Sequence, residues 1–244
     1  MKVKVKTSAI VPAHNEEPRI GTVLDTLVSS DLFDLVVVVD DGSTDDTWNE
    51  ILARPVAGIR HPTNLGKAAA LQSGLHRVPD SDAVAFIDAD LLGLKTEHLE
   101  SLLEPITENP THLMTVAQFH RARAPVDAVQ KWFSILNGQR VLSRRFLNLL
   151  PDITPLRFGI EVFMTRYARD LGPGHIQVPW RGVSHVMKEE KYGLLPGFAR
   201  RLIMYKEVMA AYLGYYPRWA KRNLGRIDTP LDVFEPPARK AASD

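Results

Sequence analysis

Short apolar runs alternate with segments of helical periodicity along the first part of the chain. Four such runs predict buried strands, at residues 8–13, 35–39, 56–60 and 83–87. Between the runs, apolar residues recur at helical spacing, and Pro18 suits the start of the first helix. Strands that alternate with helices are typical of a mostly parallel sheet with helices on both faces. We therefore predict an α/β fold.

Acidic residues follow directly after two of these predicted strands. Asp40 and Asp41 close the second strand, and Asp88 and Asp90 follow the fourth. Ligands of open α/β sheets bind outside the carboxyl ends of the strands, so we expect these side chains to line one crevice. Carboxylates one residue apart offer hard oxygen ligands to Mg²⁺ or Mn²⁺, and such a metal can hold a diphosphate. The alternative is an Asp-rich turn that binds nothing.

Beyond residue 91 the apolar pattern becomes less regular. The predicted elements are a helix over 97–106, strands over 113–118 and 176–179, and one or two helices over 126–150 with a break near Gly138. Another helix is expected over about 199–213. Residues 228–244 are rich in Pro and Ala, which favours a loose tail.

Composition narrows the class of protein. The chain has 244 residues, of which 45% are hydrophobic and 24% are charged, as in ordinary soluble domains. A net charge of only +1 argues against nucleic acid as a partner. Cysteine is absent, which excludes disulfides and thiolate metal sites. With no long apolar run and no signal-peptide core, we expect a cytoplasmic protein, with peripheral contact at the inner face of the membrane left open.

Two common phosphate-binding loops do not occur in the sequence. A Walker loop ending in Gly66 and Lys67 would require glycine at the position of His61, and no G-x-G-x-x-G follows a predicted strand. Phosphate groups are therefore expected to be held through a metal ion, which strengthens the case for the acids after the fourth strand.

Four short motifs, taken together and in this order, resemble the signatures of GT-A-fold, family-2-type glycosyltransferases. They are VPAHNEE at 11–17, VDDGSTD at 39–45, NLGK at 64–67 and DAD at 88–90. The resemblance implies a GT-A (Rossmann-like), mostly parallel central sheet, and a DxD motif that binds Mg²⁺ or Mn²⁺ together with a nucleoside-diphosphate sugar.

The resemblance also implies a domain organisation. We expect one glycosyltransferase domain over 1–227, followed by the tail. Within it, residues 1–95 form the nucleotide-sugar-binding half, 96–193 the acceptor half, and 194–227 a basic and aromatic C-terminal helical extension.

The resemblance further implies which residues contact the donor. These are Pro12, Ala13, Asn15, Glu16, Asp40, Lys67, Asp88, Ala89, Asp90, Gly138, Gln139 and Arg140. The first four would surround the nucleotide, and the last three would form a tight turn beneath the donor sugar. Asp45 and Asp46 are interpreted as helix caps rather than site residues.

Individual roles follow for the acids and the lysine. Asp40 would accept a hydrogen bond from the base, with Asp41 as the alternative for that role or as a cap of the next helix. Lys67 would contact the diphosphate or the base, unless it is a solvated lysine at a helix start. Asp88 would bind ribose or sugar hydroxyls, and Asp90 would bind the metal.

Two residues of the second half complete the expected site. Glu161 lies just inside an apolar helix start, where burial would raise its pKa toward the range of a general base. It could instead cap its own helix or pair with Arg157. In similar enzymes a histidine completes the metal shell, and His185 fits that position, although a lone histidine is often structural. Residues 158–162 and 182–185 also resemble retaining GT-A enzymes that glucosylate glycerate-type acceptors.

The segment from Arg181 to Arg226 is basic, with ten Lys or Arg against three acids, and carries interleaved aromatic residues. Such a segment suits an anionic membrane surface or a lipid-phosphate acceptor. It could equally pack on the sheet or on a second subunit, which leaves a homodimer open.

The expected activity is metal-dependent transfer of a hexose from a UDP- or GDP-sugar to an acceptor hydroxyl or phosphate. The acceptor can be a lipid phosphate, a small molecule or a glycan. A base on the opposite face of the sugar favours inversion, and retention with a glycerate-type acceptor is the alternative. A non-catalytic nucleotide-sugar-binding module or a membrane-surface interaction module is the alternative of another class.

Overall fold

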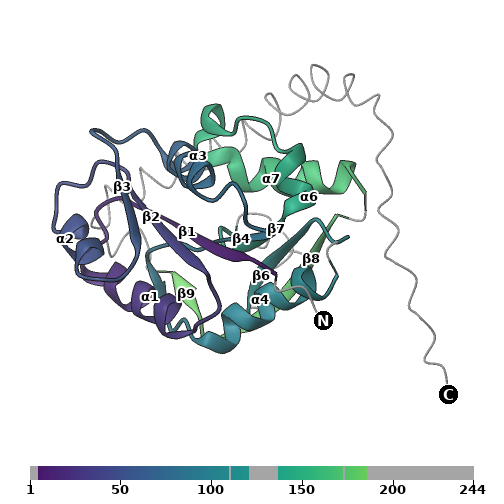
Figure 1. Ribbon diagram of the computed structural model, residues 1–244, viewed down its shortest axis with the longest axis horizontal. Helices are drawn as coiled ribbons and strands as arrows, with labels where there is room; N and C mark the ends of the chain where they lie inside the picture. The colour runs from purple at the N-terminus through teal and green to yellow at the C-terminus, as the bar shows by residue number, and fades with distance from the viewer. Residues whose placement is uncertain (1–4, 110, 121–136, 173, 186–244) are drawn as a thin grey trace.

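A computed structural model describes residues 5–109, 111–120, 137–172 and 174–185 (Figure 1). Its strands are β1 (Thr7–Ala13), β2 (Leu35–Asp40), β3 (Ala57–Arg60), β4 (Ala83–Phe86), β5 (Leu91–Leu92), β6 (Met114–His120), β7 (Arg140–Ser143), β8 (His175–Arg181) and β9 (Ser184–His185). Its helices are α1 (Glu17–Ser29), α2 (Thr47–Leu52), α3 (Lys67–Arg77), α4 (Thr96–Glu108), α6 (Arg144–Leu149), the 3₁₀ helix η1 (Thr154–Gly159) and α7 (Ile160–Asp170). Within these ranges, every helix is too short or too polar to cross a bilayer.

One mixed sheet of seven strands forms the centre of the molecule. The strand order is β3-β2-β1-β4-β7-β6-β8, and β5 pairs separately with β9. Strands β1 to β4 are parallel, and β6 is parallel to β8, whereas β7 runs antiparallel to both of its neighbours. The prediction of a mostly parallel α/β sheet is confirmed.

Each face of the sheet is covered by its own set of helices (Figure 1). Helices α1, α2 and α4 enclose one hydrophobic core, and α3, α6 and α7 enclose the other. Strand β2 shows why the sequence folds this way: Val36 and Val38 enter the first core, and Val37 and Val39 enter the second. Since side chains alternate along a strand, an unbroken valine run is buried on both faces.

One prediction for the second half is wrong. Residues 140–143, expected to be helical, form strand β7, whose four residues are all buried between β4 and β6. A short apolar run does not by itself distinguish a buried strand from a buried helix, and here the free sheet edge of β4 decided the outcome. Residues 121–136 and 186–244 lie outside the described residues, and with them the expected C-terminal helical extension and tail.

The sheet brings several chain segments to one edge. The Asp41 N–H donates to the carbonyl of Ala13, and the Ile87 N–H donates to the carbonyl of Ile10. The segments that follow β2 and β4 are thus both attached to β1, which lies between these strands. The two pairs of acids therefore emerge at the same edge, as the parallel arrangement predicted.

Candidate functional site

An ammonium group lies between two carboxylates from distant parts of the chain. Lys67 is the first residue of α3, and its Nζ is 2.7 Å from Asp88 Oδ1 and 2.8 Å from Glu161 Oε1. The three side chains are only 22%, 18% and 10% exposed, respectively. We call these three residues the charge cluster. Lys67 is therefore not the solvated helix-start lysine of the alternative interpretation.

The two carboxylates of the charge cluster stabilise the Lys67 ammonium. Burial disfavours the ammonium, but attraction to Asp88 and Glu161 outweighs this effect and raises the pKa of Lys67 above its ordinary value. Glu161 is buried near the start of α7, as expected, and its partner is a cation, the Lys67 ammonium at 2.8 Å. The side chain of Arg157, the partner in the alternative interpretation, lies outside the described part.

Gly138 and Gln139 support the charge cluster from the turn that precedes β7. Gln139 is fully buried, and its Nε2 donates to Asp88 Oδ2 at 2.7 Å while its Oε1 accepts the Asp88 N–H at 2.8 Å. A Cβ on Gly138 would lie 2.6 Å from Lys67 Nζ and 2.8 Å from Asp88 Oδ1. Only glycine permits this close approach of the backbone. The turn thus fixes the orientation of the Asp88 carboxylate.

Arg140 lies behind this turn rather than on an open surface. Its guanidinium is fully buried and donates to the carbonyls of Asn137 and Glu161. Burial lowers the pKa of Arg140 to about 10, against the opposing attraction of Glu161 and Asp88, so the group stays charged at neutral pH. Through these two hydrogen bonds, Arg140 links the turn before β7 to the start of α7. Direct contact of Arg140 with a donor stays a prediction.

Asp90 and Ala89 lie between β4 and β5. Ala89 is 3% exposed and belongs to the first core, and Asp90 is partly buried. In the β5–β9 ladder, Leu91 is the partner of His185, so the backbone of residue 185 lies beside the residue that follows Asp90. Among the described side chains, which do not include that of His185, no three acids or histidines form a metal-binding group. The metal set of Asp90 and His185 therefore stays a prediction.

The adjacent carboxylates at the end of β2 contact different partners. Asp40 is fully buried; its Oδ1 accepts the Ser43 N–H at 2.9 Å, and its Oδ2 lies 3.1 Å from Arg60 Nε. Asp41 accepts the N–H groups of Leu65 and Gly66 at 2.9 and 2.7 Å. Asp41 thus does not cap α2, but is bonded to the loop that leads directly into Lys67. Recognition of a base by Asp40 stays a prediction.

The first loop is fastened to the turn after β2. Asn15 has a φ of 56°, which asparagine tolerates, and its Oδ1 accepts the Thr44 N–H at 2.9 Å. The Glu16 N–H donates to Thr47 Oγ1 at 2.8 Å, and Pro12 and Ala13 form the end of β1. The residues expected to surround the nucleotide thus occupy the end of β1 and the loop after it, and this loop is bonded to the turn after β2.

The expected helix caps at the start of α2 differ from each other. Asp45 accepts the Thr47 N–H at 3.1 Å, as a cap does, whereas the Asp46 side chain accepts a hydrogen bond from the side chain of Asn49. Asp45 therefore acts as predicted, whereas Asp46 occupies the N-cap position of α2 without a capping bond from its side chain.

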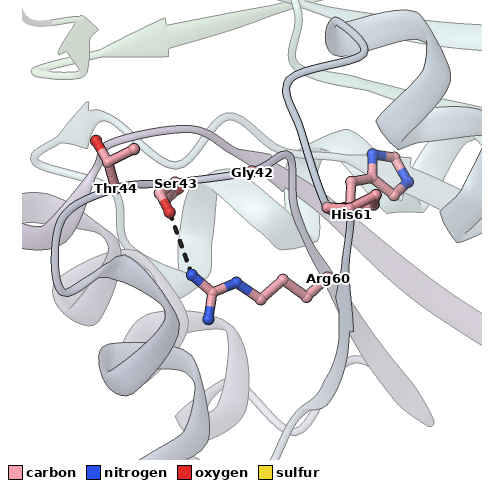
Figure 2. A pocket seen from close by; sticks show the side chains of 6 residues that line it. Gly42, Ser43, Thr44, Arg60 and His61 are labelled. Carbon is pink, nitrogen blue, oxygen red and sulfur yellow. Dashed lines mark hydrogen bonds between the residues drawn. The ribbon is translucent and has the colours of Figure 1, made fainter.

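A cavity of about 390 Å³ lies at the ends of β2 and β3. Its lining is Gly42, Ser43, Thr44, Arg60, His61 and Pro62. Figure 2 shows the Arg60 side chain reaching toward Ser43, whose carbonyl it binds at 3.2 Å, and the His61 ring pointing away from it. Sequence reasoning did not assign a role to Arg60 or His61, although both stand at the end of a predicted strand, where site residues gather.

Residues 8–168 match the family model described as Glycosyl transferase family 2. Glucosyl-3-phosphoglycerate synthase of Mycobacterium tuberculosis is 30% identical over 157 residues, which cover 61% of this chain and 48% of the relative. The 4,4'-diaponeurosporenoate glycosyltransferase of Staphylococcus aureus is 28% identical over 142 residues, covering 55% of this chain and 38% of the relative. The chain thus spans about half the length, or less, of these curated relatives.

Solved structures agree on the fold. The M. tuberculosis synthase in complex with Mn²⁺, UDP-glucose and phosphoglyceric acid has a TM-score of 0.69 at 23% identity, over 86% of this chain and 79% of that chain. Its complex with Mg²⁺ and UDP has a TM-score of 0.70 at 24% identity, over 86% and 78%. The described sheet and helices match this GT-A arrangement, which confirms the expected fold.

Proposed function

The chain belongs to glycosyl transferase family 2, and we propose that it transfers a hexosyl group from a UDP-sugar to the hydroxyl of a glycerate-type or other small acceptor. The choice of UDP and of the acceptor class is supported by the M. tuberculosis synthase, which has been crystallised with UDP-glucose and phosphoglyceric acid. The feature of this chain that carries the proposal is the charge cluster, which places a buried cation and two carboxylates at the carboxyl edge of the sheet.

Each member of the charge cluster has a role in this reaction. The Lys67 ammonium attracts the donor diphosphate, and Asp88, oriented by Gln139, accepts hydrogen bonds from sugar hydroxyls. Glu161, whose carboxylate lies 2.8 Å from the Lys67 ammonium, accepts the proton of the acceptor hydroxyl. The acceptor oxygen bonds to the anomeric carbon as the bond to the diphosphate breaks, and a single displacement of this kind inverts the anomeric centre.

The proposal includes a divalent cation. Asp90, with a hard carboxylate oxygen, and His185, whose backbone lies beside the strand after Asp90, would hold Mn²⁺ or Mg²⁺. When bound, the cation would stabilise negative charge on the diphosphate. Relatives crystallised with Mn²⁺ or Mg²⁺ support this assignment.

Calorimetric titration of UDP-glucose, with GDP-mannose for comparison, tests the donor in the presence of Mn²⁺ and of EDTA. We expect UDP-glucose to bind only with Mn²⁺, and Asp90→Ala to abolish this binding. Glu161→Gln should preserve binding and lower turnover by about 10²- to 10⁴-fold. Unchanged metal-dependent binding in the Asp90→Ala variant would refute the site assignment.

Product analysis tests the acceptor and the stereochemistry. The reaction with 3-phosphoglycerate is followed by UDP release, and the anomeric proton coupling of the product is read by NMR. An inverted product supports Glu161 as the base. A retained product would remove that role and favour the alternative in which Glu161 only positions a substrate. Absence of transfer to any acceptor despite donor binding would indicate a non-catalytic binding module.

A further inference from the structure

His61 links the end of β2 to the second turn of α3. Its Nδ1 is 2.7 Å from Asp41 Oδ1, and its Nε2 is 2.9 Å from Ser73 Oγ. The residue is 8% exposed. A carboxylate accepts hydrogen bonds, so Nδ1 is the donor to Asp41, and Nε2 shares a second hydrogen bond with the Ser73 hydroxyl.

The same Asp41 carboxylate holds the two residues before Lys67. It accepts the Leu65 N–H at Oδ1 and the Gly66 N–H at Oδ2. Gly66 has a φ of 98° and is the N-cap residue of α3, where it makes no side-chain cap. The direction in which α3 begins, and with it the position of Lys67, therefore depends on Asp41.

The turn after β2 and the loop before α3 are packed so closely that neither backbone can shift alone. A Cβ on Gly42 would lie 2.5 Å from the Thr63 carbonyl carbon and 2.7 Å from the Asn64 nitrogen. The turn after β2 and the loop before α3 thus touch backbone to backbone. A change in the orientation of Asp41 would be transmitted to the neighbouring loop rather than absorbed by side chains.

We infer that His61 is a positioning residue, which holds Asp41 so that the loop before α3 presents Lys67 between Asp88 and Glu161. This inference rests on the proposed function only where it predicts donor affinity. The structural step, from His61 through Asp41 to the loop, involves no ligand. Two measurements therefore separate the inference from the proposal.

Two isosteric substitutions separate the two bonds of His61. In His61→Asn, the side-chain amide can replace Nδ1 as donor to Asp41, whereas in His61→Gln the longer side chain places its amide near the position of Nε2, toward Ser73. We expect His61→Asn to bind UDP-glucose within about threefold of the wild type, and His61→Gln to bind about tenfold more weakly, with KM rising and kcat changing little. Ser73→Ala, which removes only the outer bond, should resemble His61→Asn.

Amide hydrogen exchange reports on the loop without any ligand. Leu65 and Gly66 should exchange about tenfold faster in His61→Gln than in the wild type and in His61→Asn. His76→Gln, on an exposed face of the same helix, is the control and should change neither measurement.

The outcomes distinguish the positioning role of His61 from the proposed function. Wild-type exchange and affinity in His61→Gln, or equal losses in the Asn and Gln variants, would overturn the positioning role. If the wild type binds no UDP-sugar, the proposed function fails, and the exchange rates alone still decide whether His61 controls the loop.

Discussion

Replacing Gly138 by alanine tests the charge cluster directly. The added Cβ would lie 2.6 Å from Lys67 Nζ and 2.8 Å from Asp88 Oδ1. Carbon needs a separation of about 3.5 Å from such atoms, so the ammonium must move by roughly 1 Å. A displacement of that size in a catalytic group costs about 10²-fold in turnover.

The stability of the fold should respond much less. The groups that must move are the Lys67 ammonium and the Asp88 carboxylate, whose Oδ2 is the atom nearest to the added Cβ, and overpacking of this kind costs about 1–2 kcal/mol. Alanine recovers about 0.4–1 kcal/mol by restricting the unfolded chain. We therefore expect the free energy of unfolding to fall by about 1 kcal/mol, which corresponds to a decrease in Tm of about 2–4 °C.

The assay is kcat/KM for transfer from UDP-glucose, measured beside thermal unfolding of the same samples. Gly21→Ala, on α1, is a matched control, because its Cβ meets Arg54 Nη2 at 2.5 Å and Glu50 Oε2 at 3.0 Å, another pair of charged side-chain ends, in α2 and just after it. The control should keep wild-type turnover. Wild-type kcat/KM in Gly138→Ala would refute the reasoning, because the charge cluster would then tolerate the displacement.

Three further predictions concern stability. Arg140→Met removes the guanidinium that donates to the buried carbonyls of Asn137 and Glu161, of which the second keeps the Thr165 hydroxyl as a donor. Urea unfolding should show a loss of about 3 kcal/mol, and an unchanged midpoint would contradict the structural role of Arg140. Arg60→Met leaves the buried carboxylate of Asp40 without its cation, and since the Arg60 side chain is 45% exposed we expect the free energy of unfolding to fall by about 1–2 kcal/mol. The control is Lys95→Met, which breaks an exposed ion pair with Glu97 and should cost less than about 0.5 kcal/mol. Burial raises the pKa of Asp45, but the hydrogen bonds from Thr47 and from the Glu17 N–H together outweigh burial and lower this pKa. Asp45 therefore contributes stability that is present above the unfolded pKa of 3.8 and is lost as pH falls through the lower folded pKa. The Tm difference between wild type and Asp45→Asn should be present at pH 7 and vanish in that acidic range, and a constant difference would count against the cap.

Much of the first half of this chain could be predicted from local patterns. The valine run of β2 specifies a strand buried on both faces, because a strand has a period of two and all of its positions are apolar. The acids after β2 and β4 were expected at one edge of the sheet, because parallel strands end together. The family resemblance implied a tight turn at Gly138, but the contact of this turn with Asp88 was not predicted.

The pairings of the site depended on tertiary structure. Strand β7 is a strand because β4 and β6 each offer it a free edge, which no local pattern reveals. Asp40 and Asp41 contact different partners, Arg60 and the loop before Lys67. Asp41 accepts hydrogen bonds from that loop only because α3 packs on the neighbouring face of the sheet. Lys67 meets Glu161 because α3 and α7 cover the same face of the sheet. Local sequence encodes the period of an element, whereas contacts between charged groups depend on which elements become neighbours.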